Sequence, residues 1–331
     1  MIKINKYSIL IFLCYIILYL LPPVNVSALE KEYYEKVLTY GTDLEIKEAF
    51  SQVRENLGRG VNRLVLEVFK QKHSNDVYMA MAEYIGTAKL DGAQDVLVDE
   101  LNRKNVNTDY RVEIINTLGR LGSSASLNPL IDFYHENSSK KRLQLAVINA
   151  LGEIGNERAE ELLIDIVKDN KEDDHIRARA ALSLGKIKSR SSLDILKNIL
   201  LNEHENKFVR MYSTYSVAKI GGIQEIDTLA KVIDDPVHEV AEYAVSAIAE
   251  MESARGADIL MQALRSDYDK VRYTAVRGLA AIQYQKAVDI LKFRARYDQN
   301  MHVRKEAGRA IEIISGNKPQ KQPHNSSKQD M

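Results

Sequence analysis

The sequence predicts an all-α solenoid built from repeated helix pairs. A short motif recurs every 31 to 33 residues between Tyr78 and Arg304, and each copy holds two amphipathic segments separated by a polar turn. Only Pro129 and Pro236 lie between the two ends of the chain, as long helical arrays require. Hydrophobic residues make up 45% of the chain, which is enough to bury a core.

The register of the repeat rests on one anchor residue per copy, which directly follows an apolar residue in most copies. Successive anchors are 33, 33, 33, 33, 31, 31 and 32 residues apart: Tyr78, Arg111, Gln144, Arg177, Arg210, Ala241, Arg272 and Arg304. Seven residues after each anchor stands an aliphatic residue, and the eighth position is Gly or Ala in every copy but the last. A small residue there predicts two helices crossing at close range, and Glu312 in the last copy is typical of a terminal helix.

Each copy is predicted to consist of a first helix, a polar turn and the helix that carries the anchor. Ala257 to Leu264 has helical spacing of its apolar residues and precedes an anchored helix, as Leu162 to Val167 precedes Ile176 to Ile187. Asp or Asn before the anchored helix is a natural N-cap, and we expect Pro236 to open another such helix.

These strings resemble HEAT repeats, in particular the short HEAT-like repeats of the phycobilisome lyase type. The resemblance is carried by Asp…Val-Arg…Ala-Leu-Gly-x-Ile, seen best in Asp174 to Ile187 and Asp269 to Ile282. It implies a right-handed α-α superhelix of about eight helix pairs, preceded by an N-terminal cap. It implies little about activity, because such repeats serve lyases, hydroxylases, glycosylases and scaffolds.

The resemblance also implies a structural ladder of hydrogen bonds between repeats. The residues that match it are Asp109, Arg111, Asp174, Arg177, Arg210, Asp269 and Arg272. Gln144 and Ala241 depart from the pattern, so we expect them to interrupt the ladder.

The N-terminus has the pattern of a secretory signal peptide over residues 1–28. Lys3 and Lys6 precede the apolar run Ile9 to Leu21, and Val26-Ser27-Ala28 puts small side chains before a cut at Ala28/Leu29. We therefore expect a periplasmic or extracellular protein. The alternative is an uncleaved membrane anchor, although the run is shorter than the roughly 20 residues that span a bilayer.

The expected division of the chain is then residues 29–60 as N-terminal capping helices, 61–315 as the repeat solenoid and 316–331 as a disordered tail rich in Pro, Gln, Ser and Lys.

Charge and motifs argue against several function classes. The chain carries 46 basic and 46 acidic residues, and loss of Lys3 and Lys6 leaves 44 basic, a net charge of −2, so no nucleic-acid partner is expected. The single Cys lies in the signal segment, and three His-Glu pairs fall at different phases of the repeat, so we expect no metal and no cofactor. No phosphate-binding loop or nucleophile-elbow motif occurs.

One helix face carries the candidate binding residues. Positions one, two, five and nine after each anchor share a face opposite the core stripe, and in HEAT solenoids that face lines the concave surface. It holds a predicted partner-binding set of Tyr212, Tyr215, Tyr243, Tyr273 and Arg277. Tyr and Arg are favoured at interface centres, but strong curvature would instead bury these side chains between adjacent helices.

The sequence thus predicts an exported, non-catalytic scaffold that binds a protein or peptide on its concave face. Two alternatives remain: an enzyme or chromophore-lyase-like protein that uses the same groove, and a self-assembling structural protein of the envelope.

Overall fold

The computed structural model describes residues 26–316, apart from 52, 54–56 and 72. The chain divides into two compact units, with the boundary between Ser126 and Leu127. Every regular element among the described residues is a helix. The signal segment up to residue 25 and the tail from residue 317 lie outside the described part.

The first unit consists of helix pairs stacked side by side. It contains α2 (Val26–Tyr40), α3 (Asp43–Ser51), α4 (Arg59–Phe69), α5 (Asn75–Ala88), α6 (Ala93–Leu101) and α7 (Thr108–Leu121). Helix α3 packs on α5 and α5 packs on α7, while α2 packs on α4. The α2/α3 pair therefore stacks on the next pair as one repeat stacks on another.

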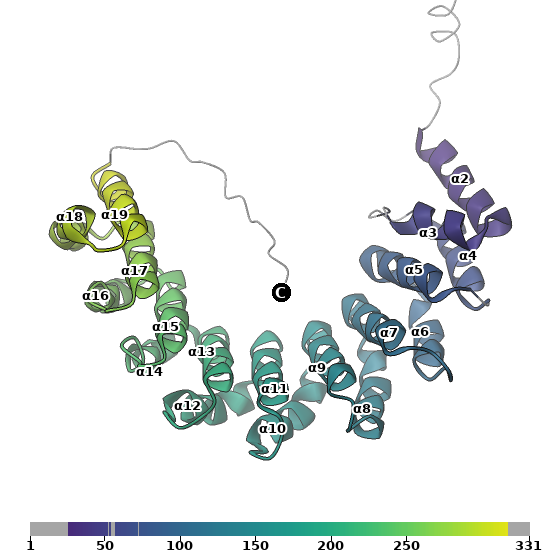
Figure 1. The fold of residues 1–331 in the computed structure, drawn as a ribbon, viewed down its shortest axis with the longest axis horizontal. Helices are drawn as coiled ribbons and strands as arrows, with labels where there is room; N and C mark the ends of the chain where they lie inside the picture. The colour runs from purple at the N-terminus through teal and green to yellow at the C-terminus, as the bar shows by residue number, and fades with distance from the viewer. Residues whose placement is uncertain (1–25, 52, 54–56, 72, 317–331) are drawn as a thin grey trace, which may run out of the picture. The chain divides into compact units, whose positions relative to one another are not determined.

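The second unit continues the same scheme in two rows (Figure 1). The inner row is α9 (Lys141–Ile154), α11 (Asp174–Lys186), α13 (Lys207–Gly221), α15 (His238–Glu250), α17 (Asp269–Ala281) and α19 (Met301–Ile314). The outer row is α8 (Leu127–Glu136), α10 (Glu160–Lys168), α12 (Leu193–Leu201), α14 (Ile226–Ala230), α16 (Ala254–Ala263) and α18 (Val288–Tyr297). The inner row lies on the concave side of this unit.

The predicted all-α repeat superhelix is confirmed, with small shifts at the boundaries. Helix α4 begins at Arg59, two residues before the expected start of the solenoid, and α2 already begins at Val26 and so spans the expected cleavage site. Pro236 precedes α15 by two residues instead of opening it, because the turn continues through Val237. Among the described helices, none has the length and apolar content to cross a bilayer; the run Ile9 to Leu21 lies outside the described residues.

Each helix that carries an anchor is followed by a residue in the left-handed backbone region, eleven or twelve positions after the anchor. Some of these residues are glycines, such as Gly122 and Gly155. Lys188 (φ 56°) and Gln283 (φ 55°) adopt the same positive φ although they carry a Cβ atom. The chain turns sharply there and enters the next outer helix. With this recurring stop, the inner helices of the second unit are 13 to 15 residues long.

Close contact between neighbouring inner helices depends on glycine at the eighth position. A Cβ atom on Gly185 would lie 2.8 Å from the Cβ and 2.9 Å from the Cα of Ser216, on the next inner helix. The Ser216 hydroxyl donates to the carbonyl of Ala181 at 2.7 Å, and Ser183 donates in the same way to Ile148 at 2.9 Å. Glycine at the eighth position of one helix and serine at the sixth of the next therefore set the helix spacing.

We expect Gly185→Ala to destabilise the protein by about 1–3 kcal/mol, because the added methyl group meets main-chain and Cβ atoms that cannot move aside. Chemical denaturation followed by circular dichroism measures the change. Gly308→Ala is the matched control, since a Cβ there meets nothing within 4 Å. That variant should be stabilised by up to about 1 kcal/mol. Equal effects of the two substitutions would contradict the close-contact argument.

Candidate functional site

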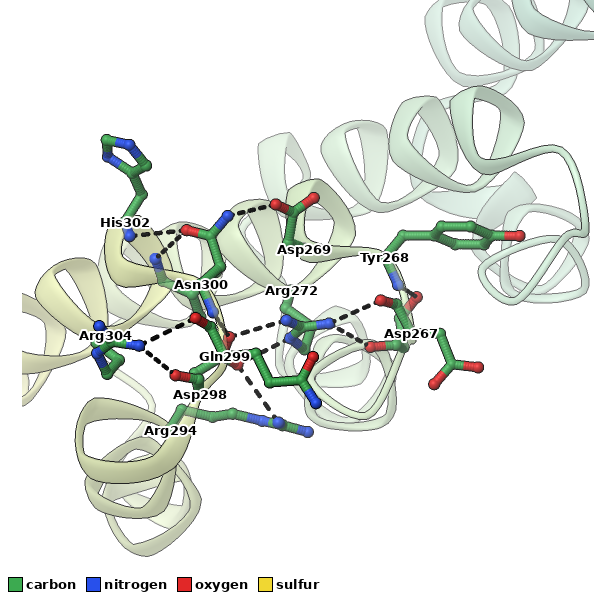
Figure 2. A network of polar contacts seen from close by, with 12 residues as sticks. Asp267, Tyr268, Asp269, Arg272, Arg294, Asp298, Gln299, Asn300, His302 and Arg304 are labelled. Carbon is green, nitrogen blue, oxygen red and sulfur yellow. Dashed lines mark hydrogen bonds and ion pairs between the residues drawn. The ribbon is translucent and has the colours of Figure 1, made fainter.

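Three ladder arginines of the second unit each join two consecutive repeats. Figure 2 shows Arg272 of α17, whose Nε and Nη2 donate to the two carboxylate oxygens of Asp298, both at 2.8 Å. Its Nη1 donates to the carbonyls of Ser266 at 2.8 Å and Asp267 at 3.0 Å, in the turn that follows its own outer helix. Asp298 follows α18 of the next repeat, and its carboxylate accepts from the backbone N–H of Asn300. One guanidinium thus binds the turn of its own repeat and the turn of the next repeat.

The same arrangement occurs at the two other ladder arginines of the second unit. Arg177 donates to both carboxylate oxygens of Glu205, at 2.9 and 2.6 Å, and to the carbonyl of Val167. Arg210 donates to both oxygens of Asp235 and to the carbonyl of Leu200. Arg210 is only 1% exposed, so a fully buried charge is held there by a complete set of partners.

A second rung runs from asparagine to aspartate. Asn206 caps α13 by accepting from the N–H of Phe208, and its amide donates to Asp174 of the preceding repeat at 2.7 Å. Asn300 caps α19 and donates to Asp269 in the same way. The predicted residues Asp174 and Asp269 therefore contact the next repeat through an asparagine, which sequence reasoning did not identify.

The ladder changes where the anchor is not arginine. Ala241 has no side-chain donor for a hydrogen bond in the ladder, and the side chain of Gln144 is buried. At the first anchor the hydrogen bond runs in the opposite direction. The anchor Tyr78 accepts it, and the guanidinium of Arg103, in the turn of the next repeat, donates it at 2.8 Å. Arg111 donates to the carbonyl of Arg103 at 3.1 Å, and Asp109 lies in the first turn of α7.

The carboxylates of the ladder are stabilised in their charged form. Hydrogen bonds from Arg177 lower the pKa of Glu205, and its burial opposes this only in part. Burial raises the pKa of Asp298, but the bonds from Arg272 and from the Asn300 N–H outweigh it, so the net shift is downward. Both groups therefore contribute to stability in their ionised form.

The predicted partner-binding tyrosines gather along α13, α15 and α17. The rings of Tyr212 and Tyr243 meet edge to face with centroids 6.4 Å apart. Tyr215 and Tyr243 line one hollow of about 150 Å³ together with Lys219 and Glu250, which form an ion pair at 3.1 Å. The ammonium of Lys219 also lies over the Tyr215 ring, 5.4 Å from its centroid.

A second hollow of about 380 Å³ adjoins the first. It is lined by Tyr273, Lys270 and His302 among others, and Glu242 lines both hollows. All four predicted tyrosines are half-buried, whereas Arg277 is exposed and lines neither hollow. Burial raises the pKa of the Tyr243 hydroxyl, and the nearby Tyr212 and Glu242 add to this, so the hydroxyl remains a hydrogen-bond donor.

Two histidines near the start of inner helices contact aromatic rings of the next repeat. His175 lies against Phe208 with centroids 5.5 Å apart, and His238 lies against Tyr268 at 5.3 Å. Among residues 26–316 as described, no group of three or more His, Cys, Asp or Glu side chains is placed to hold a metal ion.

The pKa of Glu205 predicts how stability depends on pH. Because its folded pKa lies below the ordinary value of 4.5, the stabilisation is fully present above pH 4.5 and is lost as the pH falls through the lower, folded pKa. The free energy of unfolding should therefore fall more steeply below pH 4.5 in the wild type than in Glu205→Gln. That variant should also lose roughly 1–3 kcal/mol at pH 7. Parallel pH profiles from denaturant titrations would contradict the assignment.

Comparison with solved structures finds similar folds at low sequence identity. An engineered protein is 17% identical, with 86% of this chain and 89% of that chain covered and a TM-score of 0.40. The complex of CpcE and CpcF of phycocyanin lyase from a Nostoc species is 14% identical, covering 77% and 94%, with a TM-score of 0.45. Human deoxyhypusine hydroxylase is 14% identical, covering 85% and 99%, with a TM-score of 0.35. No curated protein matches the chain.

The model of the HEAT-repeat family matches the sequence at residues 95–174, 136–218, 170–249 and 226–312. These overlapping matches together span residues 95–312, which is 218 of the 331 residues (312 − 95 + 1). They coincide with the helix pairs, the ladder and the tyrosine-lined hollows described above. The chain belongs to the HEAT-repeat family.

Proposed function

We propose that the protein is an exported, non-catalytic scaffold that binds a protein or peptide on the inner helices of its second unit. The observation that carries the proposal is the row of half-buried tyrosines on α13, α15 and α17, three of which line two adjoining hollows. Membership of the HEAT-repeat family supports a binding role, because such solenoids present extended surfaces to their partners.

The tyrosines suit a protein partner because each combines a large apolar ring with a hydroxyl group. Half-burial fixes the rings of Tyr212, Tyr215, Tyr243 and Tyr273 against the scaffold and leaves one side of each open. A rigid aromatic ring loses little side-chain entropy on binding. At about 10 Å between neighbouring inner helices, the row extends over roughly 20 Å. That length accommodates an extended segment of about six residues.

The non-catalytic part of the proposal rests on the chemistry of the two hollows. Three of their charged groups already have a partner: Lys219 pairs with Glu250, and Asp269 accepts from the side-chain amide of Asn300. The remaining lining side chains offer aromatic rings, hydroxyls, the imidazole of His302 and one loosely paired carboxylate, Glu242, which lies 3.9 Å from Lys270. These groups provide contact area and hydrogen bonds to a bound segment.

Export is proposed from the N-terminal pattern alone. Cleavage at Ala28/Leu29 would remove the first turn of α2 and leave the rest of that helix, including the buried Leu38, in place against α4. The processed chain would therefore keep its first helix pair.

The double substitution Tyr215→Ala plus Tyr243→Ala should abolish capture of the partner from an envelope extract, because it removes both rings of the first hollow. Mass spectrometry of the captured proteins is the measurement, after a thermal melt shows that the variant remains folded. Tyr297→Ala is the matched control, since Tyr297 is 58% exposed on the outer helix α18. It should retain every partner of the wild type. Equal recovery by the double variant would place the binding surface elsewhere.

Processing at the expected site predicts a mature N-terminus at or near Leu29. N-terminal sequencing of the protein isolated from its native host measures this directly. Met1 retained in a membrane fraction would contradict cleavage and would support the uncleaved anchor.

A further inference from the structure

The inner face of the second unit carries cations that lack partners, and their positions bracket the tyrosine row. Arg179 occupies the second position after its anchor on α11, as Tyr212 does on α13 and Tyr243 on α15. Arg277 occupies the fifth position on α17, as Tyr215 does on α13. Both guanidinium groups thus share the tyrosine face, one at each end of the row.

Neither of these arginines has a hydrogen-bond or ion-pair partner within the described part of the chain. Arg179 is half-buried, and Arg277 is exposed. Lys186, at the ninth position of α11, is likewise exposed and unpaired. The ladder residues Arg177, Arg210 and Arg272, by contrast, each bind a carboxylate. A half-buried guanidinium that the fold leaves without an acceptor favours an acceptor from outside.

The negative charges on this stretch lie between the two arginines. Glu250 is held by Lys219 at 3.1 Å, and Glu242 lies between the two hollows with Lys270 at 3.9 Å. Going along the face from α11 to α17, the order is therefore cationic, aromatic with carboxylates, and cationic. A complementary partner is acidic at its two ends and apolar or basic in the middle.

We propose that the site takes an extended peptide segment with two acidic residues, one for Arg179 and one for Arg277, and with apolar or aromatic residues between them. This inference rests on the proposed function and names the partner class for the same face. Three helix-to-helix steps at 8–10 Å each separate α11 from α17, roughly 24–30 Å in all. At about 3.3 Å per extended residue, the two acidic residues lie about eight positions apart.

A nucleic-acid strand fits this charge order poorly. It carries a phosphate at every nucleotide, so its charges would run over Glu242 and Glu250 between the arginines. A peptide can carry neutral residues opposite the two glutamates and negative charge only opposite the two arginines. Arg is also suited to paired hydrogen bonds with a carboxylate.

The test is selection of a displayed library of random 12-residue peptides on the purified protein, with and without the Tyr215→Ala plus Tyr243→Ala change. Enriched peptides that need the tyrosines should carry Asp or Glu at two positions about eight apart. Selection on Arg277→Glu should replace one of these acidic positions with Lys or Arg. For a peptide selected on the wild type, Arg277→Gln should weaken binding about tenfold, whereas Arg309→Gln should not.

Arg309 is the matched control because it holds the same position on α19, beyond the row, and already pairs with Glu306 at 3.6 Å. Tyrosine-dependent peptides with neutral or basic ends would overturn this inference and leave the proposed function standing. Finding no tyrosine-dependent peptide would overturn both. A 20-nucleotide single-stranded RNA that displaces the peptides and depends on the same arginines would also overturn the inference.

Discussion

The second unit depends on the buried ion pair between an anchor arginine and the carboxylate of the following repeat. At Arg177, Arg210 and Arg272 the same guanidinium binds a carbonyl at the end of its own outer helix or in the turn that follows it, and a carboxylate in the turn of the next repeat. Helix ends leave carbonyl groups without partners, and burying a charge is costly unless it is fully bonded. One arginine side chain donates to the carbonyls and also pairs with the carboxylate, and it thereby fixes the next repeat in register.

The spacing of the inner helices follows from a second constraint, the contact of glycine with serine. Ser183 and Ser216 each reach a carbonyl of the preceding inner helix over a position that carries no side chain. Between α15 and α17, where Ala241 offers no guanidinium, Gly278 packs closely against Ala249 instead. The tyrosine row crosses that junction, so its geometry there rests on close packing and on the hydrogen bond from the Tyr268 hydroxyl to the Pro236 carbonyl.

Much of this fold can be predicted from the sequence because the repeat constrains it many times over. The anchors, the small eighth position and the helix pairs each recur at a fixed interval, so single departures such as Ala241 do not obscure the pattern. The acceptors Glu205, Asp235 and Asp298 could not be assigned, because they lie 25 to 28 residues after their arginines in turns of different length. The hydrogen bond from Arg103 to Tyr78 also could not be predicted from the repeat. Tyr78 stands where most copies have an anchor arginine, and Arg103 stands in a turn where several later copies have a carboxylate.

The face of the tyrosines was predictable from helical periodicity, but its electrostatics were not. The sequence places Arg179, Lys219 and Arg277 on the same inner surface, and only the structure shows which of them already has a partner. Lys219 pairs with Glu250, and neither arginine has a partner among the residues that the structure describes. Pairing across neighbouring helices depends on side-chain direction and reach, which spacing along one helix does not determine.

A double-mutant cycle on Arg210 and Asp235 measures most directly whether the buried pairs hold the repeats together. Arg210→Met and Asp235→Leu should each cost about 3–5 kcal/mol, because each leaves its partner charged, buried and alone. The double variant should cost markedly less than the sum of the two, with a coupling energy of at least about 1.5 kcal/mol. Single losses below about 1 kcal/mol that simply add would contradict the account.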